Sequence, residues 1–204
     1  MAANLATVLA ESGEQVVLID ADLRRSAVAR AFDLDGSVGL TEVLAGTITL
    51  PDALQDTDVP GLQILAAGAT PPNPSELLGS HRMEQLIEEL SQRHFVILDA
   101  PPLLPVTDAV LLTRSADGAV LVVAAAKTHK EQVERAAATL RAVDGKVLGA
   151  ILNQVSTSKV DRIRYGDVEY GYSTSYGRDY VYEADGAGIT SRRALKGQRR
   201  RTGN

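Results

Sequence analysis

Two kinds of hydrophobic pattern alternate along the first 155 residues of the chain. Apolar residues recur at helical spacing over four segments: 2–11, 74–92, 106–114 and 130–143. Short, nearly continuous apolar runs, which are typical of buried strands, lie over four others: 15–20, 94–99, 119–124 and 146–153. Apolar strands separated by amphipathic helices predict an α/β fold, namely a doubly wound, mostly parallel sheet with helices on both faces. Ligands of such sheets bind at the carboxyl ends of the strands.

The periodic pattern disappears after Val155. Residues 156–204 are rich in Gly, Ser, Tyr and Arg and show no repeating apolar face, so we expect one domain over 1–155 and a flexible tail over 156–204. The most apolar run, 119–126, is far shorter than the roughly 20 residues that a membrane-spanning helix needs. The N-terminus also lacks the basic start of a signal peptide, so we do not expect this chain to cross a membrane.

Charge is distributed unevenly between the body of the chain and its end. The formal net charge is -5, yet residues 190–204 contain six basic residues and no acidic one, so the rest of the chain carries a charge of -11. Such an acidic body argues against a nucleic-acid partner, because binding to phosphates needs a basic face. Only the basic end is suited to a polyanion, and an anionic lipid surface is one candidate. Its residues are Arg192, Arg193, Lys196, Arg199, Arg200 and Arg201.

Polar side chains end three of the predicted strands. Asp20 and Asp22 follow one strand, Asp99 ends another and Asn153 ends a third, so all four are expected at one edge of the sheet. Structural alternatives remain open, since Asp22 is suited to cap the next helix, Asp99 to form a turn and Asn153 to cap its strand. There is no cysteine, and the three histidines show no metal-ligand spacing, so no metal beyond magnesium is expected.

Three segments resemble motifs of the bacterial tyrosine kinases, the cytoplasmic kinase domains of exopolysaccharide and capsular polysaccharide autokinases. Residues 18–25, Leu-Ile-Asp-Ala-Asp-Leu-Arg-Arg, resemble that family's second Walker-type motif, although Ser26 stands where a proline usually follows. Residues 97–102 resemble its Walker B motif, and 72–78 are similar to a further characteristic stretch. The resemblance extends over about 2–155 and implies the fold of the MinD and ParA class of P-loop ATPases.

The resemblance also implies roles for individual residues. Asp20, Asp22 and Asp99 would hold Mg²⁺, and the first two would also help to deprotonate or orient the attacking phenol. The guanidinium groups that follow, Arg24 and Arg25, would meet the charge that develops on the phosphoryl group. Asn153 would contact the adenine ring of ATP.

All six tyrosines lie between residues 165 and 182, among glycines and acidic residues that cannot build a core face. This clustering is a second feature of the family and predicts phosphoacceptors, since an acceptor must be exposed and able to reach an active site. The alternative is an aromatic low-complexity tail that self-associates. The tyrosines are Tyr165, Tyr170, Tyr172, Tyr176, Tyr180 and Tyr182.

The sequence contains no glycine-rich loop with Lys and Ser or Thr that could cradle phosphates. Members of the family carry that loop directly before a helix that reads much like residues 2–6, and the strand before the loop is usually central in the sheet. Either the chain is truncated, or it is a degenerate protein without kinase activity of its own.

The function expected from the resemblance is that of an ATP-dependent protein-tyrosine autokinase that regulates capsular or exopolysaccharide synthesis and export. It would phosphorylate the tyrosine cluster of a neighbouring subunit in a homo-oligomer. It would act in the cytoplasm, at the inner face of the plasma membrane, beside a membrane polysaccharide copolymerase that activates it. A MinD- or ParA-type ATPase and an inactive pseudokinase remain the alternatives.

Overall fold

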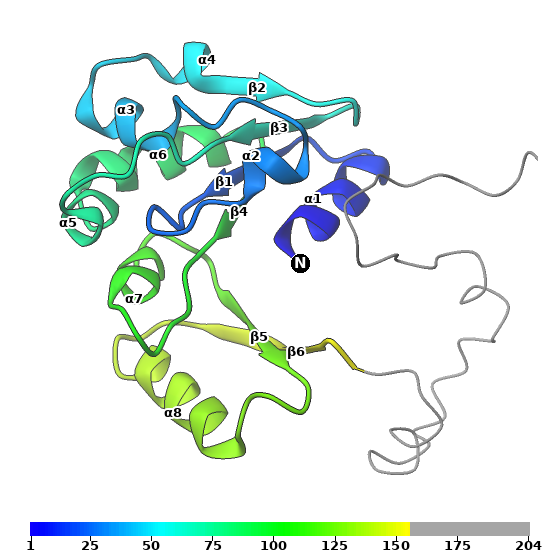
Figure 1. Cartoon of the computed structure of the whole chain (residues 1–204), viewed down its shortest axis with the longest axis vertical. Helices are drawn as coiled ribbons and strands as arrows, with labels where there is room; N and C mark the ends of the chain where they lie inside the picture. Colours follow the sequence, from blue (N-terminus) through cyan, green and yellow to red (C-terminus); the bar gives the residue numbers. More distant parts are fainter. Residues whose placement is uncertain (156–204) are drawn as a thin grey trace, which may run out of the picture. The chain divides into compact units, whose positions relative to one another are not determined.

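The computed structural model describes residues 1–155, the first of the two units into which the chain divides. The helices of this unit are α1 (Ala2–Glu11), α2 (Val28–Ala31), α3 (Leu40–Ala45), α4 (Leu50–Ala53), α5 (Pro74–Leu78), α6 (His81–Ser91), α7 (Asp108–Leu112) and α8 (Lys130–Arg141). Its strands are β1 (Val16–Asp20), β2 (Leu54–Asp56), β3 (Leu62–Leu65), β4 (Phe95–Asp99), β5 (Ala119–Ala124) and β6 (Val147–Asn153). Figure 1 shows their arrangement.

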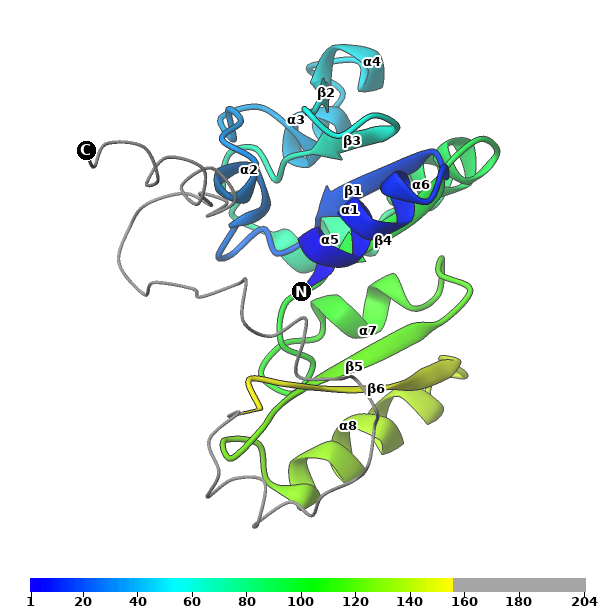
Figure 2. The same cartoon turned by 90° about the vertical axis from the view of Figure 1, so that its right-hand side faces the viewer.

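The strands form two groups. Four of them make a sheet in the order β2-β3-β1-β4, in which β1 pairs in parallel with both β3 and β4 and only β2 runs antiparallel. The other two, β5 and β6, pair in parallel in a separate sheet, with α8 beside them (Figure 2). Parallel strands alternating with helices confirm the predicted α/β class.

The side chains of β1 pack into two apolar clusters. Val17 and Ile19 enter a cluster that includes the buried side of α6, whereas Val16 and Leu18 join one that includes the alanines of α1. All four are completely buried. Successive side chains of a strand point to opposite faces, so the sheet is covered on both sides, as a parallel sheet requires. This burial fixes the position of the residues that follow β1.

The predicted helix over 74–92 is wrong in one respect, because the structure divides it into α5 and α6. Gly79 ends α5, and Ser80 takes an extended conformation with φ -78° and ψ 153°. The Ser80 hydroxyl then accepts a hydrogen bond from the backbone N–H of Met83, which makes Ser80 the N-cap of α6. The break turns the chain between two helices that pack on the same cluster.

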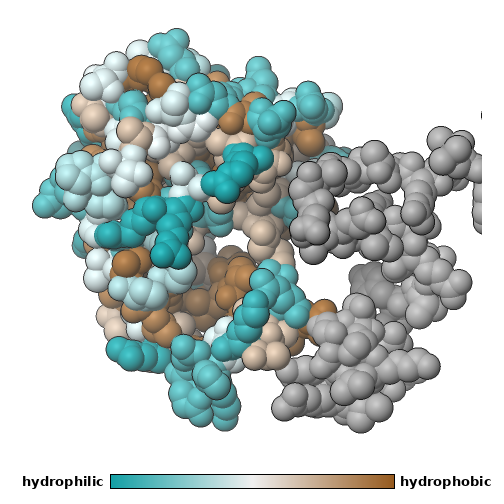
Figure 3. Space-filling model, in the orientation of Figure 1, coloured by the Kyte–Doolittle hydropathy of each residue, from teal (hydrophilic) through white to brown (hydrophobic). Residues whose placement is uncertain are grey.

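Apolar side chains remain exposed on β4 of the first sheet and on both strands of the second. In residues 1–155, β4 pairs only with β1, and β5 pairs only with β6. Phe95, Val122 and Leu148 are 52%, 52% and 59% exposed, although parallel strands are normally covered on both faces. Figure 3 shows apolar surface within a hollow on the face in view. Separately, none of the helices in the described part of the chain is both long and apolar enough to span a bilayer.

Candidate functional site

Asp20 and Asp99 are brought together at the carboxyl edge of the four-stranded sheet. They are register partners at the ends of β1 and β4, and the backbone N–H of Ala21 donates to the Asp99 carbonyl at 2.9 Å. Asp20 is 1% exposed, and Asp99 is partly buried. The predicted convergence of these two carboxylates at one edge of the sheet is confirmed.

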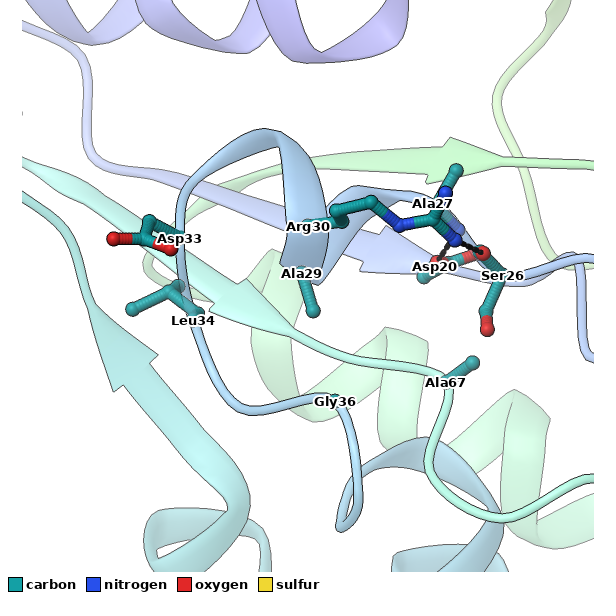
Figure 4. A pocket seen from close by; sticks show the side chains of 9 residues that line it. All are labelled: Asp20, Ser26, Ala27, Ala29, Arg30, Asp33, Leu34, Gly36 and Ala67. Atoms are coloured by element: carbon teal, nitrogen blue, oxygen red, sulfur yellow. Dashed lines mark hydrogen bonds between the residues drawn. The ribbon is translucent and has the colours of Figure 1, made fainter. Parts of the chain in front are cut away.

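The Asp20 carboxylate also organises the chain that follows β1. Its Oδ2 accepts hydrogen bonds from the backbone N–H groups of Ala27 and Val28 at 2.9 and 3.0 Å, and its Oδ1 accepts one from Asp22 at 3.3 Å. Asp20 therefore supports the start of α2, a capping role that the sequence suggested for Asp22 instead. A pocket of about 290 Å³ lies beside it, along which Arg30 extends toward Ser26 and Asp20 (Figure 4).

Asp22 holds the turn after the strand. Its Oδ1 accepts hydrogen bonds from the backbone N–H groups of Arg24 and Arg25, at 3.2 and 3.0 Å. No hydrogen bond to its Oδ2 occurs within residues 1–155, so this oxygen faces no competing protein donor there. The side chain of Arg25 likewise makes no ion pair in this part of the chain, and Arg25 is exposed.

Burial raises the pKa of both strand-end carboxyls. For Asp20, the backbone hydrogen bonds from Val28 and Ala27 oppose the effect of burial. For Asp99, the nearby negative charges of Asp20 and Asp22 raise the pKa further, while the N-terminal ammonium group lowers it. A cation stabilises the charged forms of two such carboxylates, one buried and one partly buried.

The residues fit Mg²⁺ only in part. No group of three or more His, Asp or Glu side chains in residues 1–155 is arranged to hold a metal ion, so the three-carboxylate site of Asp20, Asp22 and Asp99 stays a prediction. Mg²⁺ needs only one or two protein carboxylates and keeps several waters. The adjacent pair of Asp20 and Asp99 satisfies that smaller requirement.

Arg24 is anchored by a residue that the sequence did not single out. Its Nε donates to Oδ2 of Asp108 at 2.7 Å and its Nη2 to Oδ1 at 3.3 Å, while the Ser75 hydroxyl donates to Oδ1 at 2.5 Å. Asp108 is 0% exposed, and the Arg24 hydrogen bond holds the pKa of its carboxyl below the usual value. The only signal in the sequence was an acidic residue at the start of the otherwise apolar α7.

Asn153 ends β6, in the two-stranded sheet, where it is the register partner of Ala124. Its Oδ1 accepts a hydrogen bond from the backbone N–H of Gln154 at 2.9 Å, which matches the strand-capping alternative. The adenine contact predicted for Asn153 therefore stays a prediction. The predicted phosphoacceptor tyrosines and the basic end lie in 156–204, outside the described residues.

No protein-family model matches the chain. Among curated proteins it is similar to the tyrosine-protein kinase YwqD of Bacillus subtilis, with 45% identity over 172 residues that make up 84% of this chain and 70% of that protein. It is also 40% identical to the tyrosine-protein kinase ptk of Acinetobacter johnsonii over 156 residues, or 76% of this chain, but spans only 21% of that protein.

Solved structures show the same similarity. The kinase domain of the Escherichia coli tyrosine kinase ETK matches with a TM-score of 0.74 and 37% identity, covering 77% of this chain and 62% of that one. The septum site-determining protein MinD of Pyrococcus horikoshii, solved with Mg-ADP, matches with a TM-score of 0.65 and 25% identity over 79% of this chain and 69% of that one. Both the sequence and the fold thus resemble proteins that are named kinases or nucleotide-bound ATPases.

Proposed function

The chain belongs to the bacterial tyrosine kinase family, and from this premise we propose that it serves the ATP-dependent phosphorylation of tyrosine in capsular or exopolysaccharide synthesis. The observation that carries the proposal is the pairing of Asp20 with Asp99 at the carboxyl edge of the sheet. Two carboxylates of like charge at this edge, one buried and one partly buried, suit a cation that accompanies a nucleotide.

Each side chain that follows β1 or ends β4 has a proposed role, and Asn153, in the two-stranded sheet, has one from the family resemblance alone. ATP bound with Mg²⁺ would supply the phosphoryl group, and Asp20 and Asp99 would hold the ion directly or through water. The unused Oδ2 of Asp22 is suited to accept the proton of a tyrosine hydroxyl and so to orient the phenol. Arg24, kept in place by Asp108, and the exposed Arg25 would stabilise negative charge. Asn153 would contact the adenine ring.

The acceptors in this proposal are the six tyrosines of residues 165–182, presented by a neighbouring subunit of a homo-oligomer. A membrane polysaccharide copolymerase would activate the kinase at the inner face of the plasma membrane. The family resemblance supports this assignment, and the confinement of every tyrosine to one 18-residue stretch supports the choice of acceptor.

The test is autophosphorylation of a version that carries the family's glycine-rich Lys-Ser/Thr loop before residue 2. We expect this version to label its own tyrosine cluster, as detected by phosphotyrosine blotting, and the 204-residue chain to bind Mg-ATP weakly in calorimetry. Asp99→Asn should lower the labelling rate by orders of magnitude with an unchanged circular dichroism spectrum. Undiminished labelling in that variant would remove Asp99 from the mechanism.

A MinD-type ATPase is the second candidate, supported by the structural similarity to MinD. The two functions differ in the fate of the phosphoryl group. If the loop-bearing version releases phosphate from ATP without forming phosphotyrosine, the ATPase is the correct assignment. If it does neither, the chain is a pseudokinase.

A further inference from the structure

A second pocket, of about 460 Å³, has neither Asp20 nor Asp99 in its lining. It is formed by the loop that follows β4, by α7 and α8, and by the side chains of Arg24 and Ser75. Its volume falls in the range of small-molecule sites in proteins. None of the residues that line it is acidic, although the chain outside its basic end carries a charge of -11.

Two arginines line this pocket. Arg24 is fixed by its Nε and Nη2 contacts with buried Asp108, yet its side chain remains 41% exposed, so Nη1 is held in place without a protein acceptor in residues 1–155. Arg135 extends from α8, is exposed, and has no carboxylate within ion-pair distance in the described part of the chain. A pre-oriented guanidinium loses little conformational entropy when it binds an anion.

The rest of the lining is apolar with one available hydroxyl. Leu103, Leu104, Val106 and Val110 form the apolar part, and no hydrogen bond within residues 1–155 uses the Thr107 hydroxyl. Two cationic groups next to an apolar wall match a ligand that joins a dianionic phosphate to a flat hydrophobic ring. A phosphate on a short side chain, such as that of phosphoserine, would leave the wall exposed to water.

We propose that this pocket binds phosphotyrosine. The ligand rests on the proposed function, because the product of that reaction is a phosphotyrosine in residues 165–182 of a second copy of this chain. Each phosphate adds about -1.5 to -2 charge. Arg135 offers a positive charge that no carboxylate of residues 1–155 balances, and Arg24, whose charge Asp108 already balances, offers its Nη1–H groups as hydrogen-bond donors. The site would therefore hold the phosphorylated segment beside the loop that carries Asp22 and Arg24, and it would not recognise the unmodified one.

The test uses the full 204-residue chain and a synthetic peptide of residues 165–182 phosphorylated only at Tyr172. Titration calorimetry should detect the phosphopeptide and not the unphosphorylated peptide. Arg135→Ala should weaken binding by about 10-fold or more, the effect of losing one charge-assisted hydrogen bond. The matched control is Arg141→Ala, which removes another exposed arginine from the same helix, outside the pocket, and should leave the affinity unchanged.

Competition by small molecules identifies what the pocket recognises. Phenyl phosphate should displace the phosphopeptide at lower concentration than phosphoserine or inorganic phosphate. Equal competition by all three would overturn the aromatic part of the proposal, and equal loss in both arginine variants would overturn the pocket itself. Since no ATP is present, failure of the kinase proposal leaves this measurement unaffected, and circular dichroism of each variant checks that it is folded.

Discussion

Asp20 combines a structural and a chemical role in one carboxylate. Its two oxygens accept hydrogen bonds from three backbone N–H groups. Burial disfavours its negative charge, and that charge in turn raises the pKa of Asp99. Backbone N–H groups bind a carboxylate more strongly than a neutral amide oxygen, but they can donate to both, whereas a cation binds well only to the carboxylate. The two roles can therefore be separated by substitution.

We expect Asp20→Ala to lower the free energy of unfolding by about 1–3 kcal/mol, because Ala27 and Val28 lose their buried acceptor. Asp20→Asn retains one oxygen and removes the repulsion with Asp99, so it should cost much less. Urea denaturation of both variants measures the difference. Equal destabilisation by the two substitutions would mean that the charge, not the oxygen acceptor, stabilises the start of α2.

The Asp108 carboxyl makes the stability of the folded chain depend on pH. Because the Arg24 hydrogen bond lowers the pKa of the folded carboxyl, the folded state binds fewer protons at this group than the unfolded state does. Its contribution is complete above the unfolded pKa, which is about 3.9, and is lost as the pH falls through the lower folded value.

We therefore expect Asp108→Asn to be less stable than the parent chain at neutral pH, by about 1–3 kcal/mol. The difference should shrink below pH ~4 and vanish in stronger acid, where the parent carboxyl is itself protonated. Thermal denaturation across that range compares the two proteins. A difference that does not change with pH would show that Asp108 acts through packing alone.

The sequence revealed the strand-end carboxylates but not the Arg24–Asp108 ion pair. Asp20 and Asp99 stood out because each directly follows an apolar run, and that signal is local. Asp108 lies 84 residues from Arg24, and only the packing of α7 and α5 brings it to the loop after β1. A buried partner at that separation leaves no periodic signal in one sequence.

At the scale of elements, length decided what could be predicted. The 10-residue α1 and the 12-residue α8 each complete more than two turns, enough for an apolar face to repeat. The missed elements are short, since β2 has three residues, β3, α2 and α4 have four each, and α3 has six. Their positions depend on pairing and burial in the sheet, which local propensity does not determine.

The break between α5 and α6 depends on the Ser80 cap. Ser80→Ala removes the hydroxyl that accepts from Met83, and we expect the free energy of unfolding to fall by about 1 kcal/mol. The control is Ser91→Ala, whose hydroxyl donates to the Glu88 carbonyl at the exposed end of the same helix and should matter less. Chemical denaturation measures both. A Ser80 variant as stable as the Ser91 variant would show that packing against the core, and not the cap, begins α6.

At the scale of the whole molecule, the strands of residues 1–155 divide between two sheets, whereas the sequence predicted one. In this part of the chain β4 pairs only with β1, and β5 pairs only with β6. Composition and periodicity alone predicted a parallel sheet. They did not predict that the strands divide between two sheets, because the strands of both sheets are apolar enough to be predicted as parts of one core.

The charge asymmetry leads to the last prediction, which concerns residues 190–204. Six basic residues there follow a body with a charge of -11, so an anionic surface would attract only the end of the chain. Each basic residue near an anionic leaflet contributes about 1 kcal/mol, and salt screens the contact.

We expect the full chain to sediment with phosphatidylglycerol vesicles at low salt and to be released at high salt. A chain ending at Ile189 should remain in the supernatant, as should the full chain with uncharged phosphatidylcholine vesicles. If both proteins stay in the supernatant at low salt, the basic end does not bind membranes.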